Sequence, residues 1–246
     1  HNNLCSMHNH ESNYTKSINH CKKSISIITE LHGNNHEDLI DPFQNIGVAL
    51  QSKANYFESI EYFQKALSIE LNNQKRDRKI ADLYHNLGVS FSELDKFSEA
   101  SIYFLKSIKI KEKIFENDKR KYPQLSLATS YSSLGVIYGK IGEHDLAIEY
   151  NQKALNIRKI HARDSFDLAL VRSQTNLAYQ YIFFKNDHKK CLSLLNEIKD
   201  PVTTKYGLLI PEVQNIYAAF SLCEQYANNY KKAEEYALQA LEIAKK

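Results

Sequence analysis

A single pattern of residues recurs six times along this chain of 246 residues. One clear copy reads Asn86-Leu87-Gly88-Val89, then Ala100-Ser101-Ile102, then Lys106-Ser107-Ile108-Lys109-Ile110. The residues at the Asn86 position of the six copies are Asn3, Asn45, Asn86, Ser133, Asn176 and Ala219, which lie 41 to 47 residues apart. Self-similarity at such a period predicts a stacked array of repeats, in which each unit buries its apolar face against its neighbours.

Each copy contains two stretches of helical periodicity. In the second copy, Ile60, Phe63 and Leu67 fall at the spacing that one face of a helix requires. Short polar turns at 53–55, 94–96 and 141–143 separate the stretches, and their length is typical of antiparallel helical hairpins. We therefore predict an all-α fold, a right-handed superhelical solenoid of antiparallel helix pairs in a single domain, 1–246. Its six repeats are expected near 1–31, 41–72, 78–116, 124–161, 165–198 and 210–245.

A glycine lies inside the first helical stretch of three copies, at Gly47, Gly88 and Gly135. Glycine in a helix interior costs roughly 1 kcal/mol relative to alanine. Its recurrence therefore predicts that the second helix of each hairpin approaches the first helix closely at this point.

These residues resemble the tetratricopeptide repeat, with a Leu-Gly pair in the first helix and small residues such as Ala66 and Ala154 in the second. The long period and the run Asn86-Leu87-Gly88 resemble the kinesin-light-chain variety of that repeat. Its connecting loop keeps a histidine followed by a proline, whereas the loops here carry His36 or Pro123 separately. The resemblance covers essentially the whole chain and implies a scaffold that binds proteins or peptides.

The small position of each inner copy is the recurring glycine or alanine of its first helical stretch, namely Gly47, Gly88, Gly135 and Ala178. The residue two before it is the strongest candidate for function, and it is Asn45, Asn86, Ser133 or Asn176. In a helical hairpin repeat the first helix lines the concave surface, so these residues are expected to form a ladder along the groove. Asparagine is a mediocre helix former, and its amide can both donate to and accept from a peptide main chain. The resemblance implies the same role, because matching asparagines of the family hold peptide backbone. The alternative is that each asparagine satisfies a buried carbonyl between repeats.

The same helical face is expected to carry Gln44, His85, Arg172 and Tyr179 around the ladder. This face has few cations, whereas tetratricopeptide domains that clamp a C-terminal carboxylate use several lysines and arginines. We therefore expect the groove to hold an internal extended or helical peptide.

Three functions of different classes fit these observations. The first is a non-enzymatic protein- or peptide-binding scaffold. The second is the sensor or regulatory region of a larger bacterial signalling or defence protein, fused to an ATPase, protease or nuclease domain. The third is a receptor for a short signalling peptide. Because His1 falls inside the first helix of a repeat, we expect the chain to be a fragment of a larger protein.

Composition excludes several other classes. The net charge of +3 is far below that of a typical nucleic-acid binder, so no nucleic-acid partner is expected. No apolar run reaches the roughly 18 residues of a membrane span, and we expect neither a membrane span nor a signal peptide. We expect no catalytic residues, no metal site and no cofactor. Cys5, Cys21, Cys191 and Cys223 lack metal-type spacing, and we expect them to be reduced and buried in a cytoplasmic protein.

Overall fold

The computed structural model describes residues 2–73, 76–117, 121–161 and 167–245, and the regular structure of these residues is helical throughout. The chain divides into two compact units, unit 1 (His1–Lys119) and unit 2 (Arg120–Lys246). Unit 1 contains α1 (Asn2–His10), α2 (Tyr14–His32), the 3-10 helix η1 (Glu37–Leu39), α3 (Ile40–Ser52), α4 (Tyr56–Asn73), α5 (Asp77–Glu93) and α6 (Phe97–Asn117). Unit 2 contains α7 (Lys121–Lys140), α8 (His144–His161), α9 (Leu168–Lys185), α10 (His188–Asn196), α11 (Lys199–Tyr206), α12 (Pro211–Tyr226) and α13 (Tyr230–Ala244).

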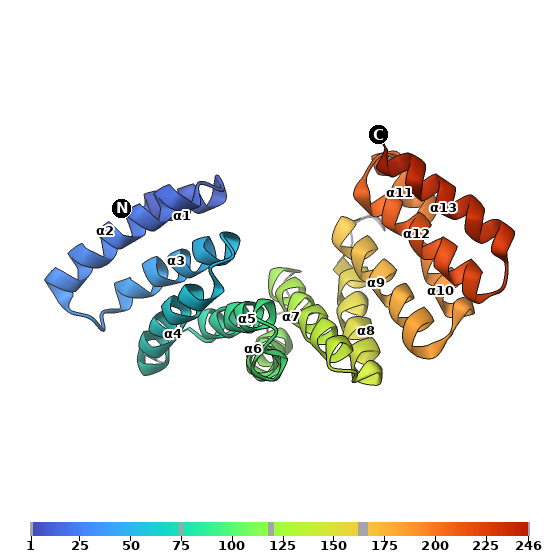
Figure 1. The fold of residues 1–246 in the computed structure, drawn as a ribbon. Coiled ribbons are helices and arrows are strands. Elements are labelled where there is room, and N and C mark those ends of the chain that lie inside the picture. Colours follow the sequence, from blue (N-terminus) through green and yellow to red (C-terminus); the bar gives the residue numbers. More distant parts are fainter. Residues whose placement is uncertain (1, 74–75, 118–120, 162–166, 246) are drawn as a thin grey trace. The chain divides into compact units, whose positions relative to one another are not determined.

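The helices pair as antiparallel hairpins, α1 with α2, α3 with α4 and α5 with α6 in unit 1, and α7 with α8, α9 with α10 and α12 with α13 in unit 2 (Figure 1). Consecutive hairpins pack against each other within each unit. The predicted all-α fold of stacked helix pairs is confirmed. The single solenoid over 1–246, its superhelical hand and its origin as a fragment stay predictions. Residue 1 of the first predicted repeat and residues 165 and 166 of the fifth lie outside the described residues.

Two short helices were not predicted from the periodicity. The helix η1 begins after His36, whose ring Nδ1 accepts a hydrogen bond from the Asp38 backbone N–H. The helix α11 lies between α10 and α12, where a loop was expected, and its Val202 is completely buried. It ends at Gly207, which has a φ of 79°. A left-handed φ of this kind favours glycine at a helix end.

Close contacts between the two helices of a hairpin form where the glycines recur. The three contacts are Gly47 with Phe63, Gly88 with Phe104, and Gly135 with Asn151. A Cβ atom added at Gly88 would lie 2.8 Å from the buried Phe104 ring. The close approach predicted from the glycines is therefore confirmed, and each contact joins residues at the same separation along the chain.

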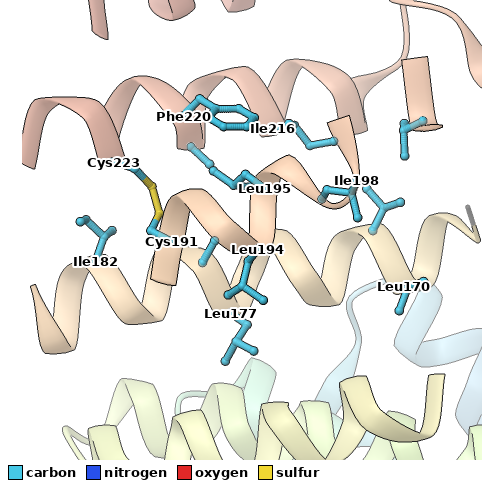
Figure 2. Packing of buried hydrophobic residues seen from close by; sticks show 14 of the residues in the cluster. Leu170, Leu177, Ile182, Cys191, Leu194, Leu195, Ile198, Ile216, Phe220 and Cys223 are labelled. Carbon is cyan, nitrogen blue, oxygen red and sulfur yellow. A yellow bond between two sulfur atoms is a disulfide. The ribbon is translucent and has the colours of Figure 1, made fainter. Parts of the chain in front are cut away.

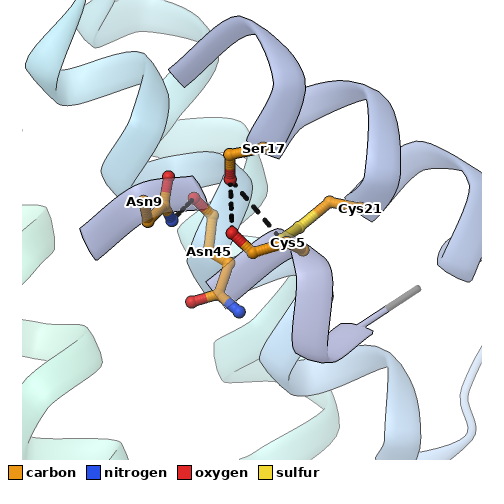
Figure 3. The surroundings of a disulfide bond; sticks show 5 residues. All are labelled: Cys5, Asn9, Ser17, Cys21 and Asn45. Carbon is orange, nitrogen blue, oxygen red and sulfur yellow. Dashed lines mark hydrogen bonds between the residues drawn. A yellow bond between two sulfur atoms is a disulfide. The ribbon is translucent and has the colours of Figure 1, made fainter. Parts of the chain in front are cut away.

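The first hairpin makes this contact with a disulfide. Cys5 takes the place of the glycine and Cys21 the place of the phenylalanine, and their Cα atoms are 5.2 Å apart (Figure 3). The buried Ser17 hydroxyl donates to the Cys5 carbonyl at 2.9 Å. The prediction that these cysteines are reduced is wrong, because the helix contact that brings a phenyl ring against glycine in other hairpins brings two sulfur atoms together here.

The second disulfide links different hairpins. Cys191 of α10 is bonded to Cys223 of α12, with the two Cα atoms 6.1 Å apart. Figure 2 shows this bond among buried apolar side chains of unit 2, including Ile182, Leu195 and Phe220. Structural disulfides are rare in cytosolic proteins. Cysteine usage therefore no longer supports the predicted cytoplasmic location.

No helix in the described part of the chain combines the length and apolar character that crossing a membrane requires.

Candidate functional site

The predicted ladder residues lie at matching points of the first helices. Asn45 is on α3 and Asn86 on α5 in unit 1, while Ser133 is on α7 and Asn176 on α9 in unit 2. Asn176 is exposed and the other three are partly exposed. Among the described residues, the side-chain amides of Asn45, Asn86 and Asn176 have no hydrogen-bond partner. These amides are therefore available to a ligand.

The main chain of the ladder, in contrast, holds neighbouring hairpins together. The Asn9 side chain donates to the Asn45 carbonyl at 2.9 Å, and the Gln51 side chain donates to the Asn86 carbonyl at 2.8 Å. Gln51 also donates to the Ser90 hydroxyl at 2.8 Å. In Figure 3 the Asn45 side-chain amide points away from its bonded carbonyl. Bridging between repeats is thus performed by Asn9 and Gln51, and the ladder asparagines are not needed for it.

Asn9 and Gln51 occupy one position of the repeat, four residues after Cys5 and Gly47 respectively. The repeat pattern of the sequence did not predict a bridging role for either residue. The signal that could have revealed it is an amide side chain recurring at this position in the first two copies.

Replacing Gln51 with alanine is expected to lower the free energy of unfolding by about 1–2 kcal/mol. The reason is the loss of two part-buried hydrogen bonds between α3 and α5. Urea denaturation measures the effect, and Gln64→Ala is the matched control because Gln64 is exposed on α4. Equal stability of the two variants would show that Gln51 does not hold the hairpins together.

Next to the ladder in unit 1, Gln44 and His85 are partly exposed. The His85 ring lies 5.3 Å from the Phe104 ring, between ring centroids. Burial, together with the nearby Lys111 ammonium, lowers the pKa of His85 to about 3. The Lys111 amine lies 3.1 Å from a carboxylate oxygen of Asp82. His85 is therefore neutral at physiological pH and contributes no positive charge to this face.

In unit 2, two of the predicted residues contact the next hairpin. The Arg172 Nε lies 3.4 Å from a Glu212 carboxylate oxygen, and the Tyr179 hydroxyl donates to the Asn215 carbonyl at 3.3 Å. Burial raises the pKa of Tyr179. Asn176 lies between these two residues on one face of α9, at the i, i+4, i+7 spacing. Of the three, Asn176 alone keeps its side chain without a described partner.

An ion pair equivalent to the Arg172–Glu212 pair occurs in unit 1. It joins Asp41 of α3 to Lys79 of α5. Asp41 and Arg172 each lie six residues before the small position of their repeat. Their partners, Lys79 and Glu212, each lie nine residues before the small position of the next repeat, which is Gly88 or Ser221. The two pairs have opposite polarity, because the acid comes first in unit 1 and the base comes first in unit 2.

Within the described residues, no group of three or more histidine, cysteine, aspartate or glutamate side chains is placed to hold a metal ion.

Comparisons with known proteins identify similar repeats in other chains. Family profiles described as tetratricopeptide repeat match residues 1–69, 42–113 and 127–167. A sequence comparison with curated proteins found no match.

Several solved structures share the fold at low sequence identity. The kinesin light chain TPR-like repeats of Podospora anserina are 16% identical with a TM-score of 0.71, covering 85% of this chain and 96% of that one. BtubC (BKLC) from P. vanneervenii is 13% identical with a TM-score of 0.73, covering 94% of this chain and 88% of that one. YrrB, a TPR protein with an unusual peptide-binding site, is 17% identical with a TM-score of 0.57, covering 91% of both chains.

Proposed function

Because the chain belongs to the tetratricopeptide repeat family, we propose that it is a non-enzymatic scaffold that binds a protein or peptide along the first helices of its hairpins. The observation that carries this proposal is that the backbone and the side chains of the ladder asparagines have different uses. The carbonyls of Asn45 and Asn86 are used between hairpins, while their side-chain amides have no described partner. A primary amide both donates and accepts hydrogen bonds, so each of these side chains can bond to a peptide main chain, which presents both kinds of group.

The charges around the ladder support an internal peptide segment as the ligand, in preference to a free C-terminal carboxylate. Lys79 is paired with Asp41, Lys111 with Asp82 and Arg172 with Glu212. A carboxylate ligand would have to compete with these acids for the cations. An internal segment needs only hydrogen bonds and shape, which the ladder and its partly exposed neighbour Gln44 can supply.

YrrB supports the proposal in a general way, since it shares the fold and its described site binds peptide. A fused effector domain and a role as receptor for a short signalling peptide remain further hypotheses, and the sequence that flanks this chain in its gene tests both.

A peptide selection tests the proposed function. Short random peptides displayed on phage are selected on the purified chain, and the affinity of the enriched peptides is measured by fluorescence anisotropy. Replacing Asn45 and Asn86 together with alanine is expected to weaken binding about tenfold or more, because each lost hydrogen bond contributes about 0.5–1.5 kcal/mol. The melting temperature is expected to change little, since neither amide has a described partner.

Asn72→Ala is the matched control, because Asn72 is an exposed helical asparagine on α4. It should leave affinity and melting unchanged. If the double variant melts earlier but binds with parental affinity at low temperature, the ladder packs the repeats and does not bind the peptide. Enrichment of no peptide at all would contradict the scaffold proposal itself.

A further inference from the structure

Two pockets of similar size lie at the same position of the repeat in the two units. The first, of about 470 Å³, is formed in unit 1 by α2, the loop after it, α3 and α4. The second, of about 440 Å³, is formed in unit 2 by the loop before α12, α12 and α13. Phe43 and Ile69 line the first pocket, and their equivalents Tyr217 and Ile243 line the second. The hairpin packing therefore creates the space, and the residues that differ decide what it can hold.

The two pockets differ in the polarity of their walls. In the unit 1 pocket, two asparagines and a lysine occupy positions that are leucine and glutamine in unit 2. The equivalent positions hold Asn34 in unit 1 and Leu208 in unit 2, Asn35 and Leu209, and Lys65 and Gln239. Lys22 adds a second cation to the unit 1 pocket, while Glu242 adds an acid to the unit 2 pocket. Of these two pockets, the one in unit 1 has the chemistry to attract an anion.

The two lysines of the unit 1 pocket are not neutralised within the described residues. Lys22 and Lys65 are exposed, and neither has an ion-pair partner there. No aspartate or glutamate lines the pocket. On α4, burial together with Glu58 and Glu61 raises the pKa of Tyr62, but neither acid lines the pocket. An anion entering the pocket would therefore meet two ammonium groups that are free to pair with it.

Aromatic rings form the other part of the wall. The Phe43 and Tyr62 rings lie 6.0 Å apart between centroids, and both are partly exposed. The Lys65 ammonium lies 5.1 Å from the centre of the Tyr62 ring. Ile25 and Ile69 complete the apolar surface. Rings and cations are thus adjacent, which suits a ligand with a flat apolar body and an acidic group.

We propose that the unit 1 pocket binds an aromatic anion, a ring that carries a phosphate or carboxylate, with Lys22 and Lys65 pairing with the acidic group. Its volume falls in the range of small-molecule sites, about 300–1,000 Å³. The site is separate from the asparagine ladder, because Phe43 and Asn45 are two residues apart on α3 and so point about 160° apart around the helix. This proposal does not rest on the peptide-binding function.

The test uses phenyl phosphate and benzoate as probes on the full chain, with binding followed by saturation-transfer NMR and titration calorimetry. Both probes are expected to bind in the millimolar range, phenyl phosphate more tightly because its dianion can pair with both lysines. The variant Lys22→Gln/Lys65→Gln, which copies the Gln239 chemistry of unit 2, is expected to weaken phenyl phosphate binding about tenfold or more. Lys23→Gln is the matched control, because Lys23 is exposed on α2 and does not line the pocket.

Each outcome decides the proposal. Binding of phenyl phosphate that the double variant weakens and Lys23→Gln leaves intact supports it. An equal loss in Lys23→Gln would assign binding to general charge and overturn the site. If benzyl alcohol bound as tightly as phenyl phosphate, the acidic group would not be needed and the proposed anion site would be wrong. If inorganic phosphate competed as strongly as phenyl phosphate, the aromatic ring would not be needed and the proposed ring contacts would be wrong. Absence of saturation transfer to any aromatic probe would reject it outright. Because the substituted lysines are exposed, unchanged melting curves confirm that a loss is not caused by unfolding.

Discussion

Replacing Cys191 and Cys223 with alanine is expected to lower the free energy of unfolding of unit 2 by about 4 kcal/mol. The bond joins residues 32 apart in sequence and ties α10 to α12, so it restricts the unfolded chain across two repeats. In an array where each hairpin is stabilised mainly by its neighbours, losing that link should loosen the last hairpin first. Urea denaturation of parent and variant measures the change.

The other disulfide provides the comparison. Cys5 and Cys21 are 16 residues apart and lie within one hairpin, so replacing both with alanine is expected to cost about 3 kcal/mol, in unit 1. Titration of thiols in the native and unfolded parent checks the premise, and few reactive thiols should appear in either state without reductant. Full reactivity of the unfolded parent would show that the cysteines are reduced and would overturn both predictions.

Replacing Gly88 with leucine is expected to lower the free energy of unfolding by about 1–3 kcal/mol. Even the Cβ atom of the new side chain would lie 2.8 Å from the Phe104 ring, which is 1% exposed and has little room to move. Overpacking of this kind outweighs the gain of up to about 1 kcal/mol from removing a glycine from a helix. Thermal melts of the purified variant measure the loss.

Gly139 supplies a control of opposite sign. It also lies inside a first helix, α7, but a Cβ atom added there would meet its nearest neighbour, the Phe184 ring, at 3.7 Å. This is an ordinary contact, so Gly139→Ala is expected to stabilise the chain by about 0.4–1 kcal/mol, chiefly because alanine restricts the unfolded chain more than glycine does. If Gly88→Leu melts with the parent while Gly139→Ala is stabilised, the glycine contact is not a packing constraint.

The helix pairs could be predicted from the sequence because each hairpin repeats the same local signals. Apolar spacing located the helices, and Gly47 and Gly88 marked where a ring from the second helix presses against the first. These contacts lie within one repeat, so the period of the sequence is enough to align them. The helix α11 was missed because it occurs in one repeat only and begins with no strong apolar period.

Contacts between repeats were harder to predict. The bond from Gln51 to the Asn86 carbonyl involves a main-chain acceptor, which leaves no trace in the sequence. The pairing of Cys191 with Cys223 depends on how α10 lies against α12, and their spacing alone does not indicate it. The predicted amides do lie on the first helices, and their role in binding stays a prediction. The contacts of Arg172 and Tyr179 with the next hairpin were not predicted.

The opposite polarity of the two equivalent ion pairs means that the hairpins are not interchangeable. Asp41 pairs with Lys79, whereas Arg172 pairs with Glu212. If the second hairpin stacked on the sixth in error, Asp41 would face Glu212, and if the fifth stacked on the third, Arg172 would face Lys79. Like charges at such contacts repel each other. Similar repeats in one chain risk joining in the wrong order as they fold, and at these two junctions the charges disfavour a wrong partner.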